Sequence, residues 1–111
     1  MSTNHEISLQ TAVDMTSRYR ASRLANFPIS ETFGLDAINK LISTTGCASL
    51  RIYYGMKADN QVDAILVAVN AAGEDILPTP ALSATDDEPV ILEDSFRCPD
   101  DCPSISPLNT D

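Results

Sequence analysis

The sequence predicts an α+β protein in which two N-terminal helices pack on an antiparallel sheet of three or four strands. Apolar residues recur at helical spacing in two segments before residue 46. Two runs of strand-forming residues, 50–56 and 64–69, follow with a short polar connection between them. From residue 78 onward prolines and acidic residues dominate, which indicates an extended C-terminal arm.

The first helix is expected from Ser8, a suitable N-cap, to about residue 26. It ends there because the residue before Pro28 avoids the helical region. The second helix is expected from Ser30, as its cap, to about residue 44 or 45, with Gly46 as the left-handed residue after it. The two helices would then form an antiparallel hairpin.

A cationic group lies in the second half of the first helix, and Arg51 and Tyr53 of the first strand could lie near it. Arginine forks bind carboxylate or phosphate at two points, so one interpretation is an anion- or partner-binding site. The other is structural: Glu31 clamps Arg20 or Arg23, or the arginines hold the acidic arm. We favour the structural interpretation, because the arm has more carboxylates than the rest of the chain can neutralise. The candidate binding residues are Arg18, Arg20, Arg23, Arg51 and Tyr53.

Alternation divides the first strand into two faces. We expect the face with Leu50, Ile52, Tyr54 and Met56 to receive the two helices. The second strand is apolar on both faces, which places it in the centre. Residues 75–77 predict a short third strand, and residues 89–92 a further edge strand. The arm or a second copy of the chain is expected to cover the opposite face, which we assign to Arg51, Tyr53, Gly55, Ala64, Leu66 and Ala68.

The net charge of -9 is unevenly distributed. Residues 1–73 hold six acids and six bases, whereas residues 74–111 hold ten acids and only Arg97. We therefore expect one domain overall, with a compact core at 1–77 and an acidic, proline-rich arm at 78–111 packed on it. The acidic surface of the arm disfavours binding to nucleic acid and anionic lipid but allows binding to a basic protein partner. With no apolar run of signal or membrane-span length, a cytoplasmic protein is expected.

Two cysteines bound a short loop, Cys98-Pro-Asp-Asp-Cys102-Pro. One interpretation is a zinc site, in which Cys47 and His5 would complete a set of three cysteines and one histidine. A second is a disulfide or a switchable dithiol, and a third is a pair of reduced cysteines in a rigid loop, which the cytoplasm favours. The odd number of cysteines argues against a complete secreted disulfide framework.

Four short sequence motifs are the basis of a resemblance to other proteins: TSRYR at 16–20, NFPISETF at 26–33, RIYYGM at 51–56, and the closing CP…CP with SPLN at 106–109. With these motifs the chain resembles a set of small uncharacterised bacterial proteins that have no assigned activity. The resemblance implies a bacterial single-domain protein and says nothing of mechanism.

The functional expectation is a non-enzymatic cytoplasmic protein that acts through a protein partner or as a homodimer. Its contact surfaces would be the acidic arm and an open sheet edge. The alternative is a metal- or redox-responsive protein that uses Cys98 and Cys102. An enzyme ranks third, since His5 is the sole histidine and no glycine-rich phosphate loop is present. We assign no catalytic residue and no cofactor other than zinc in the alternative.

Overall fold

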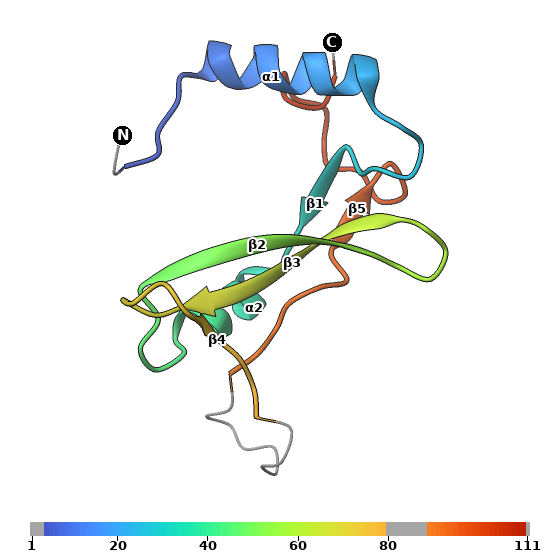
Figure 1. Ribbon diagram of the computed structural model, residues 1–111. Helices are drawn as coiled ribbons and strands as arrows, with labels where there is room; N and C mark the ends of the chain where they lie inside the picture. The colour runs from blue at the N-terminus through green and yellow to red at the C-terminus, as the bar shows by residue number, and fades with distance from the viewer. Residues whose placement is uncertain (1–3, 80–88, 111) are drawn as a thin grey trace.

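The chain folds as an α+β protein in the computed structural model, which describes residues 4–79 and 89–110 (Figure 1). Its strands form two antiparallel sheets, β2-β3-β4 and β1-β5, so the predicted class is confirmed but the single sheet is not. The acidic run at 86–88 lies outside the described residues. The elements are α1 (Leu9–Ser22), β1 (Ser30–Thr32), α2 (Leu35–Ile42), β2 (Ser49–Met56), β3 (Val62–Val69), β4 (Asp75–Ile76) and β5 (Phe96–Cys98).

The β2–β3 hairpin is the longest paired structure and was predicted. The two strands pair along their whole length, from Ser49 opposite Val69 to Met56 opposite Val62. The connection closes where the Lys57 N–H donates to the Gln61 carbonyl at 2.8 Å. β3 is central, as its two apolar faces indicated, with β4 beside its C-terminal end. The predicted edge strand at 89–92 is reduced to one bridge between Leu92 and Leu66.

The predicted pairing of faces is wrong. Leu50 lies opposite Ala68 and Ile52 opposite Leu66, so these residues share one face of the sheet. Arg51 instead lies opposite Val67, on the other face with Tyr53. The physical reason is register: a shift of one residue turns every side chain to the other face, and the five-residue connection did not fix that register in the sequence.

The core lies between α2 and β3. Leu41 of α2 is fully buried against three small or apolar residues of β3, which are Ala64, Leu66 and Ala68. The expected helix-covered face therefore receives α2, but only over β3. The β2 half of this face remains in solvent, with Ile52 49% and Tyr54 78% exposed. Half-buried side chains complete the cluster: Phe33, Ile38, Cys47, Ile76, Val90 and Leu92.

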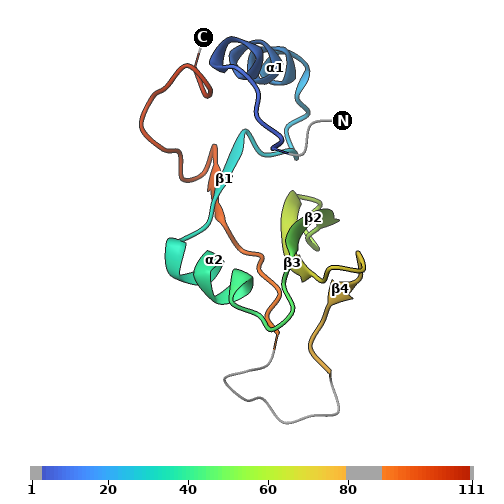
Figure 2. The ribbon, with the colours of Figure 1, turned by 90° about the vertical axis from the view of Figure 1, so that its left-hand side faces the viewer.

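Helix α1 begins as predicted, because the Ser8 hydroxyl accepts the Thr11 N–H at 3.0 Å, and it ends at Ser22. Packing of α1 on the sheet is not confirmed. The helix has no buried residue and lies apart from both sheets, next to the C-terminal segment (Figures 1 and 2). The radius of gyration is accordingly 16.1 Å, against about 13 Å for a compact chain of this length.

The predicted start of the second helix at Ser30 is wrong. Residues Ser30–Thr32 form β1, which pairs with β5 and places Glu31 opposite Arg97. α2 begins only after Gly34. Three strand residues are too few for alternation to be visible, and a serine after Pro28 imitates a helix cap. The helical hairpin in which Glu31 would meet Arg20 or Arg23 therefore does not form.

Candidate functional site: an apolar groove between α1 and β2

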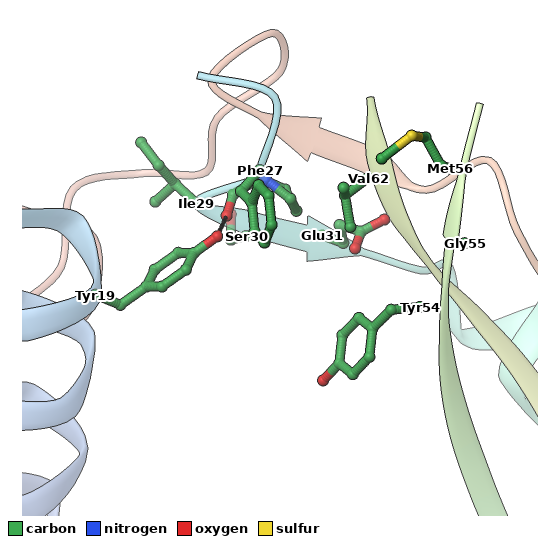
Figure 3. Close-up of a pocket in the computed structure, with 10 residues that line it drawn as sticks. Tyr19, Phe27, Ile29, Ser30, Glu31, Tyr54, Gly55, Met56 and Val62 are labelled. Carbon is green, nitrogen blue, oxygen red and sulfur yellow. Dashed lines mark hydrogen bonds between the residues drawn. The ribbon is translucent and has the colours of Figure 1, made fainter. Parts of the chain in front are cut away.

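A groove of about 730 Å³ separates the α1 region from the hairpin (Figure 3). Tyr19 of α1 and residues 27–29 form one wall, and Tyr54, Met56 and Val62 form the other. The ring of Tyr54 points toward the α1 side, and open space lies between it and the ring of Tyr19. We call this feature the groove below. Its complete lining is Tyr19, Phe27, Pro28, Ile29, Ser30, Glu31, Tyr54, Gly55, Met56 and Val62.

The α1 wall is fixed by two side chains of the helix and its exit. The Tyr19 hydroxyl donates to the Pro28 carbonyl at 2.6 Å, and Arg23 Nη1 donates to the Phe27 carbonyl at 2.6 Å. Partial burial raises the pKa of the Tyr19 hydroxyl, which keeps it protonated as a donor. The segment 27–29 therefore keeps a set position although it has no regular secondary structure.

Glu31 holds the bottom of the groove to β3. Its carboxylate accepts the Ala64 N–H at 2.9 Å and the Ser95 hydroxyl at 2.7 Å. That N–H points away from β2 and would otherwise be unpaired at a position that is only 8% exposed. Glu31 thus takes the place of a neighbouring strand, which is its role instead of the predicted arginine clamp.

Arg97 of β5 is a buried anchor next to the groove. It is 7% exposed, and its Nε donates to Asp63, itself 3% exposed, at 3.1 Å. Its other nitrogens donate to the Gln61 side chain at 2.9 Å and to the Asn26 carbonyl at 2.8 Å. The arginine therefore ties β5, β3 and the exit of α1 together. In the sequence, Arg97 stands out only as the single base of the arm.

A lysine continues this polar cluster toward solvent. Lys57 Nζ lies 2.9 Å from Glu93 and 3.5 Å from Asp63. The hydrogen bond with Lys57 lowers the pKa of the Glu93 carboxyl, and the same bond raises the pKa of Lys57. The C-terminal segment is thus held to the hairpin connection by an ion pair that is about one-third exposed.

The structure does not bring the five predicted anion-binding residues into one site. Arg51 and Tyr53 both bind Asp75 of β4, each at 2.5 Å, on the far face of the sheet. Arg20 Nη1 instead donates to the Leu108 carbonyl at 2.6 Å, so it holds the C-terminal segment against α1. Arg23 fixes the groove wall, and Arg18 is exposed. Four of the five therefore have structural partners.

The structure pairs two of the three cysteines. Cys98 and Cys102 form a disulfide, with their Cα atoms 4.4 Å apart, whereas Cys47 is free and packs against the core. Within residues 4–79 and 89–110, no three His, Cys, Asp or Glu side chains lie close enough to hold a metal ion. The zinc set of Cys47, His5 and the two loop cysteines is therefore not assembled.

Comparison with known proteins found no matching family, no similar curated protein and no similar solved structure. Among the described residues, no helix is long and apolar enough to cross a membrane. The groove itself therefore carries the functional argument. It presents aromatic, aliphatic and thioether surface. The Tyr19 hydroxyl and the Glu31 carboxylate of its lining have partners, whereas the buried Ser30 hydroxyl has none.

Proposed function

We propose that the protein acts without catalysis of its own, by binding an apolar segment of a protein partner in the groove. The observation that supports this most directly is the exposed apolar wall of β2, where Tyr54 is 78% and Met56 62% exposed. A soluble chain that leaves such side chains opposite a second, fixed apolar wall offers a binding surface. The volume of about 730 Å³ lies within the usual range for binding pockets.

The chemistry of the lining favours an apolar anchor on the partner. Tyrosine contributes large contact area at small entropic cost, and methionine adapts its shape to an incoming side chain. Because Tyr19 and Glu31 are already hydrogen-bonded, they do not demand polar partners. The net charge of -9 would further favour basic residues around the anchor by speeding association.

Site-specific photo-crosslinking in cells of the source organism tests the proposal. A benzophenone amino acid in place of Phe27, which lines the groove and is 36% exposed, should capture a partner. The same amino acid in place of Phe96, which is 60% exposed and outside the groove, is the matched control. Equal adducts at both positions, or none at Phe27, would contradict the proposal. Tyr54→Ser should remove the Phe27 adduct.

The disulfide supports a second candidate, a redox-responsive protein. A cellular dithiol would reduce the Cys98–Cys102 bond to two thiols and would itself become a disulfide. Cys98 directly follows Arg97, so reduction would act on the anchor beside the groove. The adduct yield at Phe27, measured with and without dithiothreitol, tests this: an unchanged yield rejects redox control. The cytoplasmic location is also a proposal, and the Cys98–Cys102 disulfide counts against it, because disulfides are typical of oxidising compartments.

A further inference from the structure

The outer edge of β2 is open. β2 is the first strand of the β2-β3-β4 sheet, and no described residue pairs with its other side. In an antiparallel pair, the backbone N–H and C=O groups of two opposed residues either point toward each other and bond, or both point away from each other. The Ala64 and Leu66 N–H groups point away from β2, because they bind Glu31 and Leu92. Their opposite residues, Tyr54 and Ile52, therefore direct their own backbone groups outward.

The open edge carries an apolar row. Outward backbone groups and apolar side chains belong to the same alternate residues, which are Leu50, Ile52, Tyr54 and Met56, exposed by 38%, 49%, 78% and 62%. Soluble proteins usually protect such an edge with proline, a bulge or inward charges. β2 has no proline, and its one charge, Arg51, is neutralised by Asp75 at 2.5 Å.

The edge of β3 that faces away from β2, in contrast, is paired along its length. The Val62 N–H binds the Asn26 carbonyl at 2.8 Å, and the Ala64 N–H binds Glu31. Leu92 exchanges two hydrogen bonds with Leu66, and β4 covers Ala68. Every alternate position of that edge has a partner from a different segment. The contrast with β2 indicates an edge that is left for pairing.

We propose that a second copy of the chain pairs with this edge, β2 against β2 in antiparallel orientation, about a two-fold axis at Tyr53. In this register Leu50 faces the partner's Met56 and Ile52 faces the partner's Tyr54. These pairs exchange backbone hydrogen bonds, and all four outward residues of each strand are used. Registers centred on Ile52 or Tyr54 use only three. The two three-stranded sheets become one continuous sheet.

The side chains are self-complementary in this register. Apolar residues meet apolar residues on one face, as isologous pairing requires. On the other face Arg51 lies opposite the partner's Gly55, so two arginines do not meet, and Tyr53 meets the partner's Tyr53. The partner's Ile52 and Leu50 also come to lie beside Tyr54 and Met56 and extend the wall of the groove. The dimer shares Tyr54 and Met56 with the groove, but the proposal of a dimer does not rest on the proposed groove function.

Sedimentation equilibrium of the purified full chain tests the dimer. Wild type should sediment at twice the 12.0 kDa chain mass, with a concentration-dependent return to monomer. Ile52→Lys places a charge on the edge and should give monomer at concentrations where wild type is dimeric. Leu35→Lys, at an α2 position that is 71% exposed, should leave the dimer intact. A monomeric wild type overturns the proposal, as does an Ile52→Lys dimer.

Tyr54→Pro guards against a lysine variant that does not fold. It removes one outward N–H and leaves the β2–β3 bonds in place, so it should stay folded by circular dichroism and be monomeric. A folded dimer of this variant would also overturn the proposal. If the wild type is monomeric, or if a variant remains dimeric, the photo-crosslink at Phe27 of the wild type is still expected. The dimer and the groove function can therefore be rejected separately.

A cysteine at the axis tests the register, in a Cys47→Ser background. Tyr53→Cys should form an intermolecular disulfide under mild oxidation, because opposed Cα atoms in such a pair lie about 4.5 Å apart. Ser49→Cys is the control, since its two copies would lie roughly 26 Å apart. Equal cross-linking of both variants, or none at Tyr53→Cys, would overturn this register.

Discussion

Replacement of Arg97 by alanine should destabilise the protein strongly. The side chain is 7% exposed and donates to one carboxylate, one side-chain amide and backbone carbonyls. Its removal leaves Asp63 as a charge that is 3% exposed, with only Lys57 at 3.5 Å to offset it. Loss of one partner of a buried ion pair costs about 3–5 kcal/mol.

The partial compensation by Lys57 places the expected loss near the lower end, at about 3 kcal/mol. Native domains have a free energy of unfolding of only about 5–15 kcal/mol, so the variant would lose a large share of it. Urea denaturation followed by circular dichroism measures the change as a lower midpoint with an unchanged m-value. Asp63→Leu combined with Arg97→Met should recover most of the loss, because no buried charge is left unpaired.

Arg18→Ala is the matched control. Arg18 is exposed on α1, and its replacement should change the free energy of unfolding by less than about 0.5 kcal/mol. If Arg97→Ala cost less than about 1 kcal/mol, or if the double variant were as unstable as the single one, the buried anchor would not be what holds β5 to β3.

Three further changes should have measurable effects. Glu31→Ala should cost about 1–3 kcal/mol by urea denaturation, because it orphans a buried N–H, whereas Glu31→Gln keeps an acceptor and should cost less. The Tyr53 hydrogen bond lowers the pKa of Asp75, so its stabilisation is present at neutral pH and is lost as the pH falls below about 4 through the lower folded pKa. Tyr53→Phe should weaken that acid dependence of the melting temperature; an identical pH profile would contradict it. The intact mass should increase by two hydrogen atoms when dithiothreitol reduces Cys98 and Cys102. If the protein purified without reductant already has the mass of the reduced form, the disulfide is contradicted.

The sequence predicted the parts of the fold in which period and composition were unambiguous. The hairpin, the central position of β3, the start of α1 at Ser8 and the left-handed residue at Gly46 all follow from local patterns, and Gly46 indeed has φ 85°. What failed were relations between segments. The register of β2 on β3 and the three-residue strand at Ser30 have no local signal that distinguishes them from the alternatives.

The groove could be predicted only in part. Tyr54 and Met56 were assigned to one face, but the expectation that two helices cover that face hid their exposure. The buried role of Arg97 could have been suspected from the sequence, since it is the only base of the arm and lies between Phe96 and Cys98 in a short strand-like segment. Glu31 carried none, because a carboxylate that binds a backbone N–H of a distant strand is set by tertiary structure alone.

The way β3 is enclosed has a consequence for how the chain folds. The edge of β3 that faces away from β2 is hydrogen-bonded by residues as far apart in the chain as Asn26 and Leu92. Arg97 adds a further distant contact with Asn26. Contacts between residues so far apart require large loops to close before any stabilisation is gained, which slows folding. This edge of β3 is therefore expected to remain incomplete during synthesis until residues 92–97 have left the ribosome. A chain truncated at residue 77 would lack the Leu92 hydrogen bonds to Leu66 and the Arg97 contact with Asp63, so we expect the core and the arm to form a single folding unit.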